Sequence, residues 1–172
     1  MRIYLVGSMG SGKSTLAKKM ALRLNMEFID LDKMIEAKAG RSVNDIFAIE
    51  GEDKFRELEH DCLRETLLHD QAVIATGGGT PCYFENMEFI NSNGISVYIK
   101  LNPGILTSRL MESKSPRPLL KQLSGKDEIK KRIEELLAER EHYYLQSRLI
   151  VEGENIKAET IIKMIQESEG IG

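Results

Sequence analysis

Cysteine is scarce in this sequence, and its histidines are scattered. The two cysteines of the 172-residue chain, Cys62 and Cys82, have a spacing that matches no metal-binding motif. We therefore expect no disulfide framework, and a reducing compartment, the cytoplasm, is the expected location. None of the three histidines has a serine or cysteine at a spacing typical of a catalytic triad.

Long apolar runs and an excess of positive charge are also missing. No apolar stretch approaches the roughly 20 residues that a membrane-spanning helix needs, so we expect no membrane partner. The first residues lead directly into a predicted strand, and we expect no signal peptide. The formal net charge is -3, whereas a protein that binds a nucleic-acid backbone usually presents a basic face, so we expect no nucleic-acid partner.

The residues that are present describe a globular α/β protein. Hydrophobic residues make up 41% of the sequence and charged residues 30%, which is typical neither of a membrane protein nor of a disordered one. A chain of 172 residues can bury the core of one α/β domain and is too short for two ordinary ones. Because no repeat or boundary interrupts it, we expect a single domain over residues 1–172.

The most informative stretch is GSMGSGKST at residues 7–15, which matches the phosphate-binding pattern G-x-x-x-x-G-K-[ST]. An apolar run, Ile3–Val6, precedes it and a helical pattern follows, which is the context that the motif requires. The glycines allow backbone N–H groups to point at a polyphosphate. Lys13 is then placed to reach the outer phosphates and Ser14 to ligate Mg²⁺. We predict that the chain binds a nucleoside triphosphate; an ordinary strand-to-helix turn is the alternative.

Two aspartates follow the next predicted strand. Residues 28–32, FIDLD, read as a short buried strand, in which residues two apart point to the same side. We therefore expect Asp30 and Asp32 to leave the strand end together, toward the ligand crevice of an open α/β sheet. The two carboxylates would repel each other unless a metal ion or a substrate compensates. Helix capping by Asp32 is the alternative, because a helical pattern begins directly after it.

A helical region is predicted over residues 42–68, with a break near Gly51. In its second part Glu59 falls on the apolar stripe, four residues after Phe55. Arg56 is three residues before Glu59, close enough to pair with it. An inward ion pair is either a structural tie or part of a site. Both interpretations stay open for Glu59, and for Arg56 we favour the site.

Three consecutive glycines follow another buried strand. Ala72–Ala75 reads as that strand and runs into the triplet Gly77, Gly78 and Gly79. Glycine in such a place indicates a backbone that approaches another group closely. A flexible linker is the alternative, but linkers do not normally begin at the carboxyl end of a buried strand. A fourth strand is predicted over residues 95–101.

Two arginines stand out in the carboxyl-terminal half. Arg117 lies between two prolines in a loop over residues 112–125, which we interpret as a mobile lid that carries a guanidinium; an ordinary surface loop is the alternative. The helix predicted over residues 126–144 places Arg140 on its apolar face, where an arginine needs an anion. A side chain that merely reaches the rim is the alternative. A fifth strand is predicted over residues 149–151, followed by an amphipathic helix.

These residues together describe a kinase for a small hydroxylated anion. Phosphoryl transfer requires donor and acceptor in line and compensation of the spreading negative charge, which Lys13, Mg²⁺ and Arg117 can supply. Asp32 is the better candidate to accept the hydrogen bond of the acceptor hydroxyl. Arg56 and Arg140 can bind a carboxylate or phosphate on the acceptor.

The pattern resembles the shikimate kinase family over nearly the whole chain. The phosphate loop alone is shared by many enzymes, whereas F-R-x-x-E at residues 55–59, G-G-G at 77–79 and R-P-L-L at 117–120 are specific to that family in this order. The resemblance implies the P-loop kinase fold of nucleoside monophosphate kinases, with a five-stranded parallel sheet in the order 2-3-1-4-5 flanked by helices. A substrate-binding helical region then covers residues 32–68 and a mobile lid residues 112–125, and a monomer is expected.

The resemblance also implies an activity and its residues. The activity is ATP-dependent phosphorylation of the 3-hydroxyl of shikimate, with Mg²⁺, in the synthesis of chorismate and the aromatic amino acids. Catalytic roles are implied for Lys13, Asp32 and Arg117, and Mg²⁺ binding for Ser14. The residues themselves place Asp30 in the metal shell, since Asp32 is assigned to the acceptor hydroxyl. The implied nucleotide contacts are Gly10, Ser11, Gly12, Lys13, Ser14, Thr15 and Arg117, with Arg109 and Asn155 (or Lys157) as candidates for the adenine clamp. The implied acceptor contacts are Asp32, Phe47, Phe55, Arg56, Glu59, Gly78, Gly79 and Arg140.

Two rival functions stay in view. A gluconate-type kinase shares the fold and the loop, and the paired arginines would accept its carboxylate; the F-R-x-x-E and R-P-L-L elements favour shikimate. A nucleotide-gated binding module without turnover is a different class. The set of Lys13, Ser14, Asp30, Asp32 and Arg117 disfavours it, because a module that never turns over does not need these groups.

Overall fold

One parallel sheet organises the chain. The computed structural model describes residues 1–113 and 118–170, and within them five strands form a sheet in the order β2-β3-β1-β4-β5, which confirms the expected order. All neighbouring strands run parallel. The strands are β1 (Arg2–Val6), β2 (Glu27–Asp30), β3 (Ala72–Ala75), β4 (Ile95–Lys100) and β5 (Leu149–Glu152).

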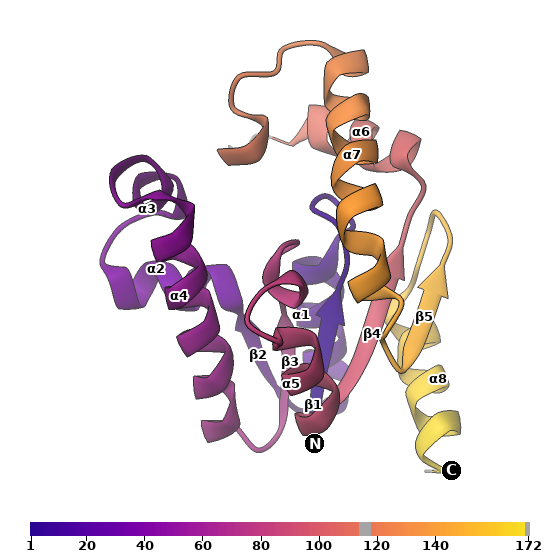
Figure 1. Cartoon of the computed structure of the whole chain (residues 1–172). Helices are drawn as coiled ribbons and strands as arrows, with labels where there is room; N and C mark the ends of the chain where they lie inside the picture. The colour runs from indigo at the N-terminus through magenta and orange to yellow at the C-terminus, as the bar shows by residue number, and fades with distance from the viewer. Residues whose placement is uncertain (114–117, 171–172) are drawn as a thin grey trace.

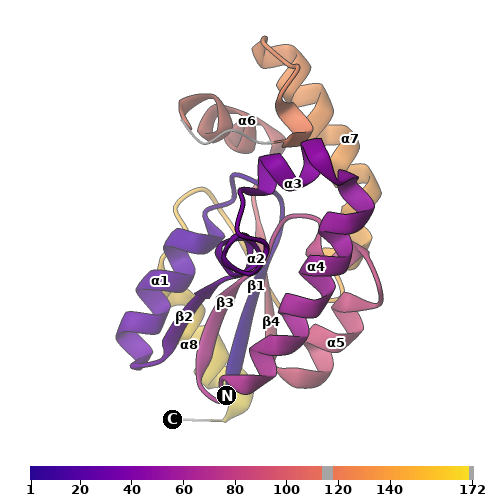
Figure 2. The same ribbon diagram turned by 90° about the vertical axis from the view of Figure 1, so that its left-hand side faces the viewer.

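Helices cover both faces of the sheet (Figure 1). Figure 2 shows α1 (Lys13–Leu24) and α8 (Ala158–Glu169) on one side and α4 (Gly51–Glu65) and α5 (Asn86–Asn93) on the other. The remaining helices are α2 (Leu31–Ala39), α3 (Val43–Ile49), α6 (Pro103–Glu112) and α7 (Lys126–Tyr144), with short 3-10 turns η1 (Thr66–Leu68), η2 (Thr80–Cys82) and η3 (Pro118–Leu120).

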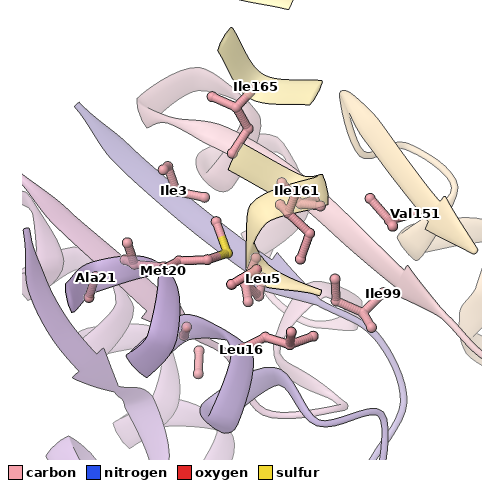
Figure 3. Close-up of a cluster of buried hydrophobic side chains, with 14 of the residues drawn as sticks. Ile3, Leu5, Leu16, Met20, Ala21, Ile99, Val151, Ile161 and Ile165 are labelled. Carbon is pink, nitrogen blue, oxygen red and sulfur yellow. The ribbon is translucent and has the colours of Figure 1, made fainter. Parts of the chain in front are cut away.

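The alternation of strand side chains divides the core into two layers. Ile3 and Leu5 point to the face covered by α1 and α8, where Figure 3 shows them beside Met20 and Ile161. These four side chains are fully buried, and each contributes roughly 1.5–3 kcal/mol by leaving water. Tyr4, between the two strand residues, points to the opposite layer. The central strand is therefore apolar on both faces, as expected of a parallel sheet covered on both sides.

The second layer carries the helices that surround the candidate site. Buried residues of α3, α4 and α7 pack against the sheet there, among them Ile46, Leu63 and Tyr144. This layer fixes α4 and α7 to the same face of the sheet. Side chains from these two helices can therefore meet above the carboxyl ends of β1 and β3, where open α/β sheets bind ligands.

The end of strand β2 differs from the prediction. The strand stops at Asp30, and α2 begins at Leu31, because the Asp30 carboxylate caps that helix by accepting from the backbone N–H of Lys33 at 3.3 Å. The prediction that Asp32 belongs to the strand was wrong, and so was the alternative that Asp32 is the cap. Asp32 lies in the first turn of α2. A strong capping residue ended the strand earlier than its apolar pattern indicated.

Other boundaries agree more closely. Strand β3 and helix α7 have the predicted bounds, and the predicted helical region breaks at Gly51, which has a φ of 85°. Helix α5 was not predicted; it has eight residues and a weakly apolar face. Within residues 1–113 and 118–170, none of the helices combines the length and the apolar character needed to cross a membrane.

Candidate active site

The phosphate loop connects β1 to α1 through backbone shapes that favour glycine. Gly7, Gly10 and Gly12 have φ values of 141°, 79° and 86°, which side chains rarely tolerate. A Cβ at Gly7 would also come within 2.8 Å of the Ile99 carbonyl oxygen, and one at Gly10 within 2.9 Å of the Leu110 side chain. The glycines of the motif therefore allow both the curl of the loop and its close packing.

Lys13 and Ser14, the first residues of α1, direct their side chains to the loop and its surroundings. The Lys13 ammonium donates to the carbonyl oxygens of Gly7 and Ser8, each at 2.8 Å. The Ser14 hydroxyl donates to Asp30 Oδ2 at 2.7 Å. A hydroxyl and a carboxylate thus lie together beside the loop, and such hard oxygen ligands fit Mg²⁺.

The described residues 1–113 and 118–170 contain no cluster of three histidine, cysteine, aspartate or glutamate side chains able to hold a metal ion. Mg²⁺ is usually bound by one or two protein oxygens, by water and by the phosphates of a nucleotide. The Ser14 hydroxyl and the Asp30 carboxylate place two such oxygens side by side, and their role in holding the ion stays a prediction.

A cavity of about 360 Å³ lies over the loop, and we name it the phosphate cavity. Its wall is formed by the phosphate loop, by the residues around Asp30 and Asp32, by the start of the glycine triplet and by the end of α6. They are Met9, Gly10, Gly12, Lys13, Ser14, Thr15, Asp30, Asp32, Thr76, Gly77, Gly78, Arg109, Leu110 and Ser113.

A second cavity, the acceptor cavity, adjoins the first. Its volume is about 80 Å³, so it admits only a small molecule, and its wall contains Arg56 from α4 and Arg140 from α7. Both arginines are buried, with 4% and 8% of their surface exposed. The predicted inward position of Arg140 is confirmed, since its side chain does not extend along the surface. Two guanidinium groups in one small cavity provide a binding site for an anion.

The two cavities meet at Asp32. Four residues line both of them: Met9, Asp32, Gly77 and Gly78. A group bound above the loop and a group bound between the arginines would therefore face each other across this carboxylate. That is the arrangement that in-line transfer between two bound molecules requires.

Each glycine of the triplet allows a different close approach, and none has a positive φ. A Cβ at Gly77 would lie 2.9 Å from Glu59 Oε1, and one at Gly78 3.2 Å from the Met9 amide nitrogen. A Cβ at Gly79 would lie 2.5 Å from the Arg56 Nη2 atom. The triplet is therefore a close-approach surface, as predicted, and not a linker.

Glu59 satisfies both interpretations that the sequence left open. It is fully buried and lines the acceptor cavity. Its carboxylate accepts from Arg56 Nη1 at 2.8 Å and from the Thr80 hydroxyl at 2.6 Å. Burial would lower the pKa of Arg56, but the neighbouring Glu59 and Glu52 carboxylates outweigh it and hold that pKa above its usual value. Arg56 is therefore charged at any physiological pH.

Apolar side chains form part of the acceptor cavity wall. The rings of Phe47 and Phe55 lie 4.7 Å apart between centroids, and Pro118 and Leu119 of η3 complete this wall. Residues 118 and 119 belong to the segment predicted as a lid. Arg117, the predicted catalytic arginine of that segment, lies outside the described residues, so its role stays a prediction.

A third cavity, the base cavity, continues from the phosphate cavity and has a volume of about 330 Å³. Arg109 lies on its wall and donates to the Ser11 carbonyl oxygen at 3.3 Å and to the Glu154 carbonyl oxygen at 2.8 Å. Glu154 and Ile156 line this cavity, whereas Asn155 and Lys157 do not. The two residues that flank Asn155 in the sequence therefore line the base cavity, and Asn155 itself does not.

Most residues of the acceptor cavity were predictable from the sequence, but part of its wall was not. All eight residues predicted for the acceptor line the acceptor cavity. Met9, Val43, Gly77, Pro118 and Leu119 line it too and were not selected. Four of them fell inside motifs already in view, the phosphate loop, the glycine triplet and R-P-L-L. Val43 has no signal of its own, because it reaches the cavity only through the packing of α3.

The fold and the paired cavities define a P-loop phosphotransferase with a separate site for a small anionic acceptor. Comparison with known proteins agrees. The family model for shikimate kinase matches residues 9–168. A shikimate kinase of Parabacteroides distasonis is 40% identical over 97% of this chain and 96% of its own length.

Solved structures give the same result. A shikimate kinase from Bacteroides thetaiotaomicron has a TM-score of 0.90 and 38% identity over 99% of this chain and 98% of its own. One from Acinetobacter baumannii, solved in complex with shikimate, has a TM-score of 0.87 and 34% identity over 98% of this chain and 93% of its own. This chain belongs to the shikimate kinase family.

Proposed function

We propose that this chain transfers the terminal phosphoryl group of ATP to the 3-hydroxyl of shikimate and releases shikimate 3-phosphate and ADP, a step of chorismate and aromatic amino-acid synthesis. The observation that carries the proposal is the junction of the two cavities at Asp32, with the phosphate loop on one side and Arg56 and Arg140 on the other. The similarity to a relative solved with shikimate supports it.

The nucleotide half binds phosphate mainly through positive charge and backbone N–H groups. The loop amides and Lys13 bind the outer phosphates, and the helix dipole of α1 adds to their positive potential. Ser14 and Asp30 hold Mg²⁺, which neutralises phosphate charge when bound. Arg109 supports the base cavity by linking the loop to Glu154. Arg117 is proposed to approach the transferring phosphoryl group from the lid.

The acceptor half orients the alcohol. Arg56 and Arg140 bind the shikimate carboxylate, each by charge-assisted contacts worth about 1.5–3 kcal/mol. Asp32 accepts the hydrogen bond of the attacking hydroxyl and directs it at the phosphate cavity. Phe47 and Phe55 exclude water from one side, which protects the phosphoryl group from hydrolysis.

The proposal is tested by an ADP-release assay in which shikimate, gluconate and AMP are offered separately with ATP and Mg²⁺. We expect turnover with shikimate and only background ATP hydrolysis with the other two. Turnover with gluconate and none with shikimate would replace the proposed acceptor. ATP binding without turnover on any of the three would favour a nucleotide-gated binding module.

We further propose one domain over residues 1–172 that acts as a monomer in the cytoplasm without a nucleic-acid or membrane partner. The substrate-binding region is proposed at residues 32–68 and the lid at residues 112–125. Light scattering at working concentration measures the oligomeric state.

A further inference from the structure

One face of α4 is held by the turn that follows the glycine triplet. Glu52, Arg56, His60 and Arg64 recur at four-residue intervals, so they share one side of the helix. All four contact residues 83–86. Figure 2 shows α4 beside α5, the helix that this turn leads into.

Each contact joins a different pair of groups. The Tyr83 hydroxyl donates to Glu52 Oε1 at 3.1 Å. The Tyr83 ring lies over the Arg56 guanidinium, with its centroid 4.3 Å from Cζ. Further along the helix, the Phe84 ring stands edge-on to His60 at 5.0 Å between centroids, and Arg64 Nη1 donates to Asn86 Oδ1 at 2.8 Å.

The turn holds an unfavourable backbone shape. Phe84 and Glu85 are consecutive residues in the left-handed region, with φ values of 49° and 56°, and neither is glycine. Such a conformation costs free energy and persists only where the surroundings impose it. Here Asn86 is fully buried and its side chain donates to the Thr80 carbonyl oxygen at 2.9 Å, which anchors the turn. Tyr83 directly precedes these two residues, so the same anchored turn fixes where its side chain begins.

Tyr83 and Glu52 contact Arg56 from outside the acceptor cavity. Glu52 Oε1 accepts from Arg56 Nε at 3.2 Å and from Nη2 at 2.9 Å, and Glu59 accepts from Nη1. These bonds use three of the five N–H groups of a guanidinium. Neither Glu52 nor Tyr83 lines the cavity, whereas Arg56 does. Arg56 is therefore the residue of the cavity wall that Tyr83 and Glu52 contact directly.

We propose that Tyr83 is a positioning residue for recognition of the acceptor carboxylate. Its ring covers one face of the Arg56 guanidinium and its hydroxyl orients Glu52, so Arg56 loses its rotamer freedom before the acceptor arrives. The proposal rests on the proposed function, in which Arg56 binds the shikimate carboxylate. It adds a residue that touches neither the nucleotide nor the acceptor.

The experiment compares the wild-type chain with three variants. Tyr83→Phe keeps the ring and removes the hydroxyl, and Tyr83→Leu removes both. Phe89→Leu is the matched control, because the Phe89 ring lies over the Arg64 guanidinium at 4.7 Å, the same kind of contact two turns from Arg56. For each protein, KM for shikimate, KM for ATP, kcat and the melting temperature are measured.

We expect Tyr83→Leu to raise the shikimate KM about tenfold and Tyr83→Phe about threefold, with kcat and the ATP KM nearly unchanged. Phe89→Leu should lower the melting temperature comparably without changing the shikimate KM. A purely structural role would give the two leucine variants the same kinetic profile. An unchanged shikimate KM in Tyr83→Leu would overturn the proposal.

A second measurement isolates the carboxylate. The carboxamide of shikimate replaces the acid as acceptor, and the ratio of kcat/KM values for acid and amide is compared between wild type and Tyr83→Leu. The ratio should shrink severalfold in the variant, because a less ordered Arg56 discriminates less. An equal ratio in both proteins would overturn the proposal. If the wild type neither binds nor phosphorylates shikimate, the proposed function fails first and this inference fails with it.

Discussion

The phosphate half and the acceptor half of the site are built in opposite ways. The groups proposed to bind phosphate lie mostly on one continuous loop, as backbone amides plus Lys13 and Ser14 from the next turn, with Asp30 at the end of β2 beside them. The acceptor half collects side chains from α2, α3, α4 and α7 and the backbone of the glycine triplet. A local motif is therefore enough for the first half, whereas the second exists only once the second core layer has packed.

The largest effect is expected where the halves meet. Asp32→Asn keeps the size of the side chain and removes the charge that orients the hydroxyl, so kcat should fall by about 10²- to 10⁴-fold. The ATP dissociation constant should change little, because Lys13 and the loop amides remain. Rapid-quench kinetics and ATP titration measure the two quantities. Undiminished turnover would remove Asp32 from the mechanism.

Gly79→Ala perturbs only the acceptor half. The added Cβ would lie 2.5–2.7 Å from the Nη2, Nη1 and Cζ atoms of Arg56, so the guanidinium must move from a position fixed by two carboxylates. We expect the shikimate KM to rise by about 100-fold, since the ion pair with the acceptor is largely lost. The ATP KM serves as the internal control. Equal losses for both substrates would contradict the separation of the halves.

Arg140→Ala removes one of the two guanidinium groups and leaves the other in place. The shikimate dissociation constant should rise by about one to two decades, as expected for one charge-assisted contact. Calorimetric titration without nucleotide measures it directly. A larger loss of shikimate kcat than of affinity would instead place Arg140 on the reacting groups.

The smallest effect concerns pH and stability. Burial opposes ionisation of Glu52, but the bonds and charge of Arg56 outweigh it and hold the pKa of this carboxyl below its ordinary value of 4.5. A lowered pKa stabilises the fold fully above that ordinary value, and the gain is lost as the pH falls through the folded-state pKa. Glu52→Gln should therefore destabilise the chain at pH 7 and progressively less below pH 4.5.

Urea unfolding at several pH values gives this comparison. The curves of the wild type and Glu52→Gln should converge at acid pH, where the native carboxyl is itself protonated. A constant offset at every pH would mean that size or packing, and not charge, determines the difference.

The features that could be predicted from the sequence follow the division between the phosphate half and the acceptor half. The loop, the inward face of Arg140 and the triplet were predictable because each depends on a short motif or on helical periodicity. Asp32 was assigned to a strand because the apolar pattern of residues 28–32 hid the capping preference of Asp30. Tyr83 and Glu52 were invisible, since they meet Arg56 only after α4 and the strained turn have packed. Asn155 was chosen from its loop, while the neighbouring Glu154 and Ile156 line the cavity.

Helix α7 joins the two ends of the acceptor half in one element. It has 19 residues, so it is about 28 Å long. Its amino terminus follows the proposed lid, and near its carboxyl terminus Arg140 lies one turn before Tyr144, whose hydroxyl donates to the Gly78 carbonyl oxygen. The helix is thus anchored close to its guanidinium, and nearer its amino terminus the buried Ile133 packs with Leu106 of α6. One rigid element with two anchors therefore spans the distance between the residues that follow the proposed lid and the arginine of the acceptor cavity.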